Sequence, residues 1–152
     1  MDKTSSTRIG LDNFWAYQVV VLADQVSRYT LDVVRTEANL NQSQWRVLAA
    51  VADKPGRSAA DVTAVTPMDK TIVSRAVASL IKLDMIKRTP SRDDKRIGAL
   101  DMTALGAERY NLISLKLAET LNASVLNGAS TAEFNDAVKH FRQYVSDLSS
   151  KP

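Results

Sequence analysis

One stretch of this sequence, residues 85–102, constrains the fold most, because it breaks an otherwise helical pattern. The segment "MIKRTPSRDDKRIGALDM" contains no helical period. It is typical of two short β segments, 85–89 and 97–101, joined by a charged turn. Before and after it, apolar residues recur every three or four positions, as they do on one face of a helix. We therefore predict a mainly α-helical chain interrupted by a β-hairpin.

Composition narrows the class of protein. A length of 152 residues suits one domain. The chain is 45% hydrophobic and 24% charged, which is the usual composition of a globular protein. The absence of cysteine and the single histidine, His140, exclude disulfides, thiolate zinc sites and multi-histidine metal sites. The N-terminus lacks an apolar signal core, and the longest apolar run, 19–23, is too short to span a bilayer. We expect a cytoplasmic protein without a cofactor.

Three helices are predicted between residues 41 and 83. Asn41 with Gln44 resembles a capping box that opens a helix reaching residue 53. Ser58 with Asp61 opens a helix of about two turns. The third helix runs from about residue 69 to 83. Its predicted core side consists of Ile72, Val73, Ala76, Val77, Leu80 and Leu83.

Longer helices flank this central part. Residues 11–35 carry an apolar stripe, and a helix from Thr103 ends at residues 127–128. Ser130 and Glu133 then cap a last helix, whose apolar residues repeat at spacings of four and three. This narrow heptad seam requires a partner helix. The stripe consists of Trp15, Val19, Leu22, Val26, Tyr29 and Val33, and the seam of Phe134, Val138, Phe141, Val145 and Leu148.

Positive charge is concentrated in the middle of the chain. Residues 54–96 contain ten Lys or Arg and five Asp or Glu, a net +5, against +3 for the whole chain. Such asymmetry fits an anionic partner such as nucleic acid, because protein cations release counterions from phosphates. A solvated charged face explains it equally well on charge alone.

The order of elements favours the first interpretation. A short helix, a turn and a longer helix form a helix-turn-helix, whose second helix enters a major groove. The exposed side of that helix is small and polar, so it can approach base edges closely. The following hairpin turn carries three cations, a geometry suited to a minor groove. We predict DNA contacts by Lys70, Thr71, Ser74, Arg75 and Ser79 of the helix, and by Arg92, Asp94, Lys95 and Arg96 of the turn.

With these motifs, the sequence resembles the MarR family of winged-helix transcriptional regulators over nearly its whole length. Asp94-Lys95-Arg96, followed by Met102-Thr103 and Gly106, matches the family's wing pattern, with Met in place of Leu. "SQWRVL" at 43–48 and "TIVSRAVASLIKLDMIKR" at 71–88 match as well. Asp84 stands where the family commonly has a glycine in a left-handed turn, a conformation that Asp tolerates better than most residues.

The resemblance implies a winged helix-turn-helix of about six helices and a two- to three-stranded wing. Within a single domain, 1–152, residues 41–102 would bind DNA, and 9–37 with 103–149 would form a homodimer. Arg96 would be the wing arginine, positioned by Asp94. The homodimer would read a pseudo-palindromic operator, as a repressor released by an aromatic or phenolic ligand. Trp15, Trp45 and Arg46 could line the ligand pocket, or both tryptophans could simply belong to apolar packing.

Two other functions compete with DNA binding. An enzyme would need a nucleophile with its base, a metal motif or a phosphate-binding loop, and the sequence contains none of these patterns. A winged helix can also bind protein and expose its basic wing only to solvent. This protein-interaction module without DNA readout is the main alternative.

Overall fold

The computed structural model describes residues 9–90, 98–123 and 130–150. The chain divides into two compact units, Met1–Ile113 and Ser114–Pro152. Along the first unit follow a 3-10 turn, Leu11–Asn13, and then α1 (Trp15–Ala38), α2 (Gln42–Asp53), α3 (Ala59–Val65), α4 (Lys70–Lys82), β1 (Ile86–Pro90) and β2 (Gly98–Met102). Helix α5 (Ala104–Ala123) begins in the first unit and ends in the second, which also contains α6 (Thr131–Ser149). The predicted mainly helical chain with a β-hairpin is confirmed.

Local sequence signals set the ends of these helices. Asn41 and Gln44 form the predicted capping box of α2, and Ser58 and Asp61 form that of α3. The side chain of Asp69 accepts a hydrogen bond of 2.8 Å from the backbone N–H of Ile72 and so caps α4. Asp84 has a φ of 55°, the left-handed turn that we predict after α4. No described helix is both long and apolar enough to cross a membrane.

The strands pair antiparallel, with Ile86 opposite Met102 and Pro90 opposite Gly98. Each strand starts one residue later than predicted. Arg57 adds a bridge to Leu100 on the free side of β2. Its carbonyl accepts from the Leu100 N–H at 2.9 Å, and the Gly56 N–H donates to the Leu100 carbonyl at 2.9 Å. The loop between α2 and α3 is thereby tied to the hairpin.

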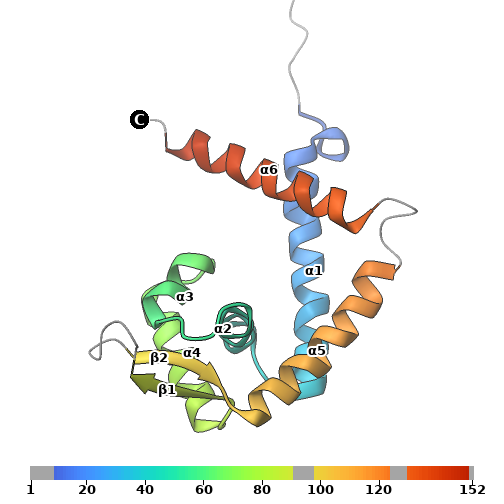
Figure 1. The fold of residues 1–152 in the computed structure, drawn as a ribbon. Helices are drawn as coiled ribbons and strands as arrows, with labels where there is room; N and C mark the ends of the chain where they lie inside the picture. Colours follow the sequence, from blue (N-terminus) through green and yellow to red (C-terminus); the bar gives the residue numbers. More distant parts are fainter. Residues whose placement is uncertain (1–8, 91–97, 124–129, 151–152) are drawn as a thin grey trace, which may run out of the picture. The chain divides into compact units, whose positions relative to one another are not determined.

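The core of the first unit lies where α2, α3 and α4 gather beside the hairpin (Figure 1). Apolar side chains from these elements, with one each from α1 and α5, are almost completely excluded from solvent. They include Val34, Val47, Leu48, Val51, Val62, Val73, Val77, Leu80, Ile86, Leu100 and Ile113. Two residues predicted for the core side of this helix are exposed instead. Ile72 of α4 is 39% exposed, and Leu83, directly after α4, is 43% exposed. Both lie at the border of the apolar face, where tertiary neighbours decide burial.

The end of α4 is joined to the start of α5 at Thr103. Its backbone N–H donates to the Met85 carbonyl at 3.1 Å, and its hydroxyl donates to the Asp84 carbonyl. The same hydroxyl accepts from the Gly106 N–H at 3.0 Å. A Cβ atom at Gly106 would lie 1.9 Å from the Met85 oxygen, a distance that no side chain can occupy. In the Thr-x-x-Gly part of the wing motif, Thr103 is therefore needed for its hydrogen bonds and Gly106 because there is no room for a side chain.

Candidate nucleic-acid interface

One face of α4 is open to solvent and carries the predicted recognition residues. Lys70, Thr71, Ser74 and Arg75 are exposed, and Ala78 and Lys82 continue the same face. Thr71, Arg75, Ala78 and Lys82 recur at spacings of four, three and four, which places them along one side of the helix. The helix itself contains no acidic residue. This surface is shallow and cationic, as a helix must be to approach base edges.

The opposite side of α4 holds the helix in place through α2, α3 and β1. Helix α3 precedes it, and the connection 66–69 is compact. The Thr66 hydroxyl donates to the Val62 carbonyl at 2.7 Å, Met68 is buried, and Asp69 caps the next helix. The predicted helix-turn-helix is therefore present, with its second helix turning a free side outward.

Ser79 is less accessible than the other four predicted recognition residues of α4. It is half-buried, and its hydroxyl accepts a hydrogen bond of 2.6 Å from the side-chain amide of Gln44 on α2. The other four recognition residues on α4 are exposed, whereas Ser79 lies at the edge of the face and is engaged inside the protein. On a helical wheel, Ser79 lies at the border between the exposed and the buried face. The sequence pattern therefore could not show that its hydroxyl bonds to α2.

The hairpin after α4 forms the base of a wing. The predicted tip residues Arg92, Asp94, Lys95 and Arg96 lie outside the described residues. Below the tip, the Thr89 hydroxyl donates to the Asp101 carboxylate across the strands at 2.8 Å. Lys87 and Arg88 of β1 are exposed. They add two cations to the hairpin, on opposite faces because successive side chains of a strand alternate, and the sequence prediction did not single them out.

Arg57 holds the wing to the end of α2, and the sequence prediction did not single it out either. Its guanidinium donates to the Ala50 carbonyl at 2.6 Å and pairs with the Asp53 carboxylate at 2.8 Å. The side chain is only 14% exposed. Because its backbone also bridges Leu100, this one residue connects the end of α2 with β2. The "PGR" turn, in which Gly56 has a φ of 84°, is the sequence signal for this arrangement.

Salt bridges within the described residues engage Arg28, Arg57 and Lys139. Arg28 on α1 pairs with Asp24 at 2.8 Å, and Lys139 on α6 pairs with Asp136 at 3.4 Å. Within the described part of the chain, no salt bridge joins a carboxylate to a cation of α4 or β1. Those cations are Lys70, Arg75, Lys82, Lys87 and Arg88. Their charge is available to an anionic partner.

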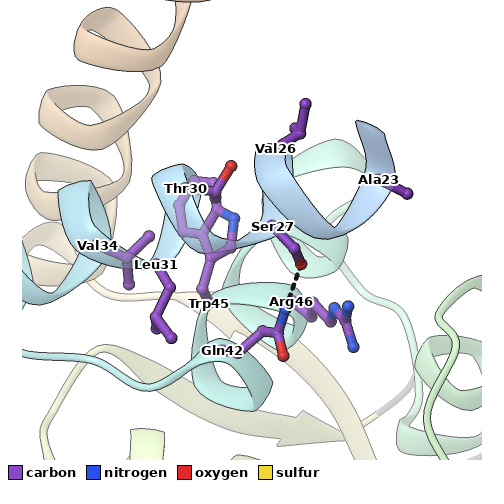
Figure 2. Close-up of a pocket in the computed structure, with 9 residues that line it drawn as sticks. All are labelled: Ala23, Val26, Ser27, Thr30, Leu31, Val34, Gln42, Trp45 and Arg46. Carbon is purple, nitrogen blue, oxygen red and sulfur yellow. Dashed lines mark hydrogen bonds between the residues drawn. The ribbon is translucent and has the colours of Figure 1, made fainter. Parts of the chain in front are cut away.

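A separate pocket of about 300 Å³ lies between α1 and α2 (Figure 2). Of the three residues predicted for a ligand pocket, Trp45 and Arg46 line this one and Trp15 does not. Trp45 also stacks on Tyr110 of α5, with ring centroids 5.6 Å apart. At the wall, the Gln42 amide donates to the Ser27 hydroxyl at 2.5 Å. The remaining lining residues are Ala23, Val26, Thr30, Leu31 and Val34.

Within this chain, the predicted dimerisation residues are substantially exposed to solvent. Phe134, Val138, Phe141, Val145 and Leu148 of α6 are 41–51% exposed, and no residue of α6 is buried. On α1, the first four residues of the stripe are 38–53% exposed. The last two, Tyr29 and Val33, are half-buried. Among the described residues, no cluster of three or more His, Cys, Asp or Glu could hold a metal ion.

Comparisons with known proteins agree with this architecture. Residues 38–97 match the model of the MarR family. The chain is similar to a MarR/EmrR family transcriptional regulator from Acinetobacter sp. ADP1, with 20% identity and a TM-score of 0.75 over 94% of this chain and 100% of that one. It is also similar to Staphylococcus aureus MarR in complex with salicylate and kanamycin, with 19% identity and a TM-score of 0.74 over 93% and 95%.

A third similar structure is the transcriptional repressor CouR bound to a 23-mer DNA duplex. It has 20% identity and a TM-score of 0.69, over 93% of this chain and 99% of that one. No curated protein matches the sequence. The resemblance predicted from the wing and recognition motifs is confirmed: residues 38–97 carry the MarR family pattern, and the chain has the fold of MarR-family winged-helix transcriptional regulators.

Proposed function

We propose that this protein is a transcriptional regulator that binds double-stranded DNA in a sequence-specific manner. The observation that carries the proposal is the exposed face of α4, which combines small side chains with cations that form no salt bridge in the described structure. Thr71 and Ala78 leave room for base edges, and Arg75 can reach a guanine. The similar CouR structure contains a DNA duplex, which supports this proposal.

The wing contributes the second set of contacts in this proposal. Arg96 enters a minor groove, oriented by Asp94, while Arg92 and Lys95 approach phosphates. Lys87 and Arg88, exposed on β1, are two further cations that can approach phosphates. Base contacts from the helix give specificity, and the wing cations give affinity that depends on salt.

The DNA-binding form is a homodimer that represses transcription from a pseudo-palindromic operator. One winged helix makes few contacts, whereas two related by a twofold axis read half-sites about 34–36 Å apart. The seam on α6 and the exposed part of the α1 stripe supply apolar surface for this dimer. Covering such a surface is favourable, at roughly 25 cal/mol for each Å² of apolar area removed from water.

The pocket between α1 and α2 binds a small aromatic carboxylate or phenol that releases the DNA. Its wall is mostly apolar, Trp45 offers an aromatic surface, and Arg46 supplies a cation for a carboxylate. The similar S. aureus structure contains salicylate, so salicylate is a suitable probe. In a Trp15→Phe background, salicylate should change the fluorescence of Trp45, and Arg46→Gln should weaken this response. A wild-type fluorescence that salicylate leaves unchanged would contradict the proposed ligand class.

DNA binding is tested by selecting bound fragments from random DNA and measuring their affinity. Arg75→Ala should lower the affinity by about 1–3 kcal/mol if Arg75 reads a base, and should relax selection at that base. Arg96→Ala should weaken binding and reduce the slope of log affinity against log salt by about one. Arg28→Ala, which removes a paired cation from α1, serves as the control. If Arg75→Ala and Arg96→Ala bind DNA as the wild type does, the cationic face serves another partner.

A further inference from the structure

Gln44 is unusual within the first unit. It is 8% exposed, and it is the only buried polar or charged residue among those that the structure describes. An amide removed from water costs free energy unless its donors and acceptors are bonded. The partners of this side chain therefore indicate why a polar group is placed there.

Both ends of the Gln44 amide are bonded. One partner is at the start of its own helix, α2, and the other is on α4. Its oxygen accepts from the Asn41 backbone N–H at 2.7 Å, while the Asn41 side chain accepts from the Gln44 N–H at 2.9 Å. Its nitrogen donates to the Ser79 hydroxyl at 2.6 Å, 35 residues further along the chain. A planar group with both ends held fixes the distance between the first turn of α2 and this point on α4.

Ser79 occupies a place on α4 from which the recognition face can be controlled. It lies four residues after Arg75 and three before Lys82, at the border between the exposed face and the core. The core contacts of α4, made by Val77 and Leu80 among others, are apolar and non-directional. They hold the helix against the core through attraction that has no preferred direction. A hydrogen bond is directional, and the Gln44–Ser79 bond is the one side-chain hydrogen bond that we find between α4 and another described helix.

We propose that Gln44 is a positioning residue for DNA recognition, which acts through Ser79 to set the rotation of α4 in the major groove. The inference rests on the proposed function and refines it, because Ser79 then serves the interface from inside and does not contact DNA. Base readout requires side chains to meet base edges in one geometry, whereas attraction to phosphates tolerates small displacements. Loss of the bond should therefore reduce specific binding and spare non-specific binding.

The test uses a selected DNA fragment, a scrambled fragment and four variants. Gln44→Met keeps the length of the side chain and removes the amide. Ser79→Val and Ser79→Thr have the same shape and differ only in the hydroxyl, so Ser79→Thr is the conservative rescue. Gln143→Met makes the same change as Gln44→Met at an exposed glutamine on α6. Thermal unfolding verifies that each variant is folded.

Gln44→Met and Ser79→Val should each weaken specific binding by about three- to tenfold, the affinity ratio expected for one hydrogen bond. Binding to the scrambled fragment and its salt dependence should stay at the wild-type level, and Ser79→Thr and Gln143→Met should bind as the wild type does. The double variant Gln44→Met/Ser79→Val should be no weaker than the weaker single variant, because Gln44→Met already removes the bond that Ser79→Val removes, together with the bond to Asn41.

Several results would overturn the inference. If the two losses multiply in the double variant, Ser79 acts on DNA independently of Gln44. If folded Gln44→Met binds as the wild type does, the bond has no positioning role. Should Gln44→Met fail to fold, the Ser79 pair decides, and equal affinities of Ser79→Val and Ser79→Thr would reject the inference. A wild-type protein without preference for any selected fragment would instead refute the proposed function, and this inference with it.

Discussion

The central lobe, residues 40–102, and the last helix, α6, use apolar side chains in opposite ways. In the lobe, Leu48, Val77 and Leu80 have no exposed surface. On α6, Phe141 is 51% exposed and Val145 is 48% exposed, although both repeat at the spacing of an apolar helical face. The comparison shows that a regular apolar pattern does not reveal where the face is buried. The narrow heptad spacing on α6 is typical of a helix that packs against a partner helix.

The difference also separates the expected roles of the two regions. The lobe encloses a core from several elements, including the polar link between Gln44 and Ser79. It can present α4 as a rigid surface. The faces of α6 and of the first half of α1 carry large apolar side chains that are 38–53% exposed. We infer that the lobe reads DNA and that these helices set the distance between two lobes.

The largest effect is expected from a charge placed in the α6 seam. Phe141→Asp should convert the dimer into monomers, because each partner would have to bury an unpaired carboxylate. We expect the dimer dissociation constant to rise by more than about a thousandfold, which corresponds to a penalty of about 4 kcal/mol. Sedimentation velocity over a range of concentrations measures this change.

The matched control is Gln143→Glu, which adds the same charge on the opposite side of α6. It should leave the dimer intact. If Phe141→Asp still sediments as a dimer, the seam is not the dimer interface. The exposed apolar face of α6 would then not be explained by dimerisation.

A smaller effect is expected where the lobe joins α5. Gly106→Ala should lower the free energy of unfolding by roughly 1–3 kcal/mol, because the added methyl group would overlap the Met85 carbonyl. Gly10→Ala is the control, since a Cβ atom there has nothing within 4 Å. Chemical denaturation measures both variants. Equal stabilities for the two variants would show that this junction adapts and that the lobe is less rigid than its packing implies.

The smallest effect concerns the cap of α3 in the helix-turn-helix. The Asp61 carboxylate accepts hydrogen bonds from the backbone N–H and the hydroxyl of Ser58, which hold its pKa below the ordinary value. A lowered pKa stabilises the folded state above the unfolded-state pKa, and this contribution is lost as the pH falls through the folded-state pKa. The wild type should therefore exceed Asp61→Asn in stability at pH 7 by more than at about pH 3. Denaturation at both values tests this, and an unchanged difference would contradict it.

Much of the lobe could be predicted because its signals are local. The capping pairs at Asn41 and Ser58, and the left-handed residue Asp84, depend on neighbours within a few positions of the chain. The hairpin was predicted to within one residue, because loss of helical period and turn residues mark it directly. The exposed recognition residues from Lys70 to Arg75 also follow from helical periodicity.

The features that the sequence did not indicate depend on contacts between segments that are distant in the sequence. The bond of Ser79 to Gln44 depends on how two helices cross, and the wing support by Arg57 depends on a strand 43 positions later. Trp15 shares the apolar stripe of α1, but it precedes the first pocket residue, Ala23, by eight positions. At 1.5 Å per residue this is about 12 Å along the helix. Periodicity shows which side of a helix a residue occupies, and the pocket depends on the position along its axis.

The salt dependence of DNA binding tests the central claim most directly. The wild-type protein should bind a selected fragment at least about a thousandfold more tightly than a scrambled one at physiological salt. Its log affinity should fall linearly with log salt concentration, since the cations of α4 and the wing displace counterions. An affinity that is independent of both DNA sequence and salt would contradict the account and leave the winged helix as a protein-interaction module.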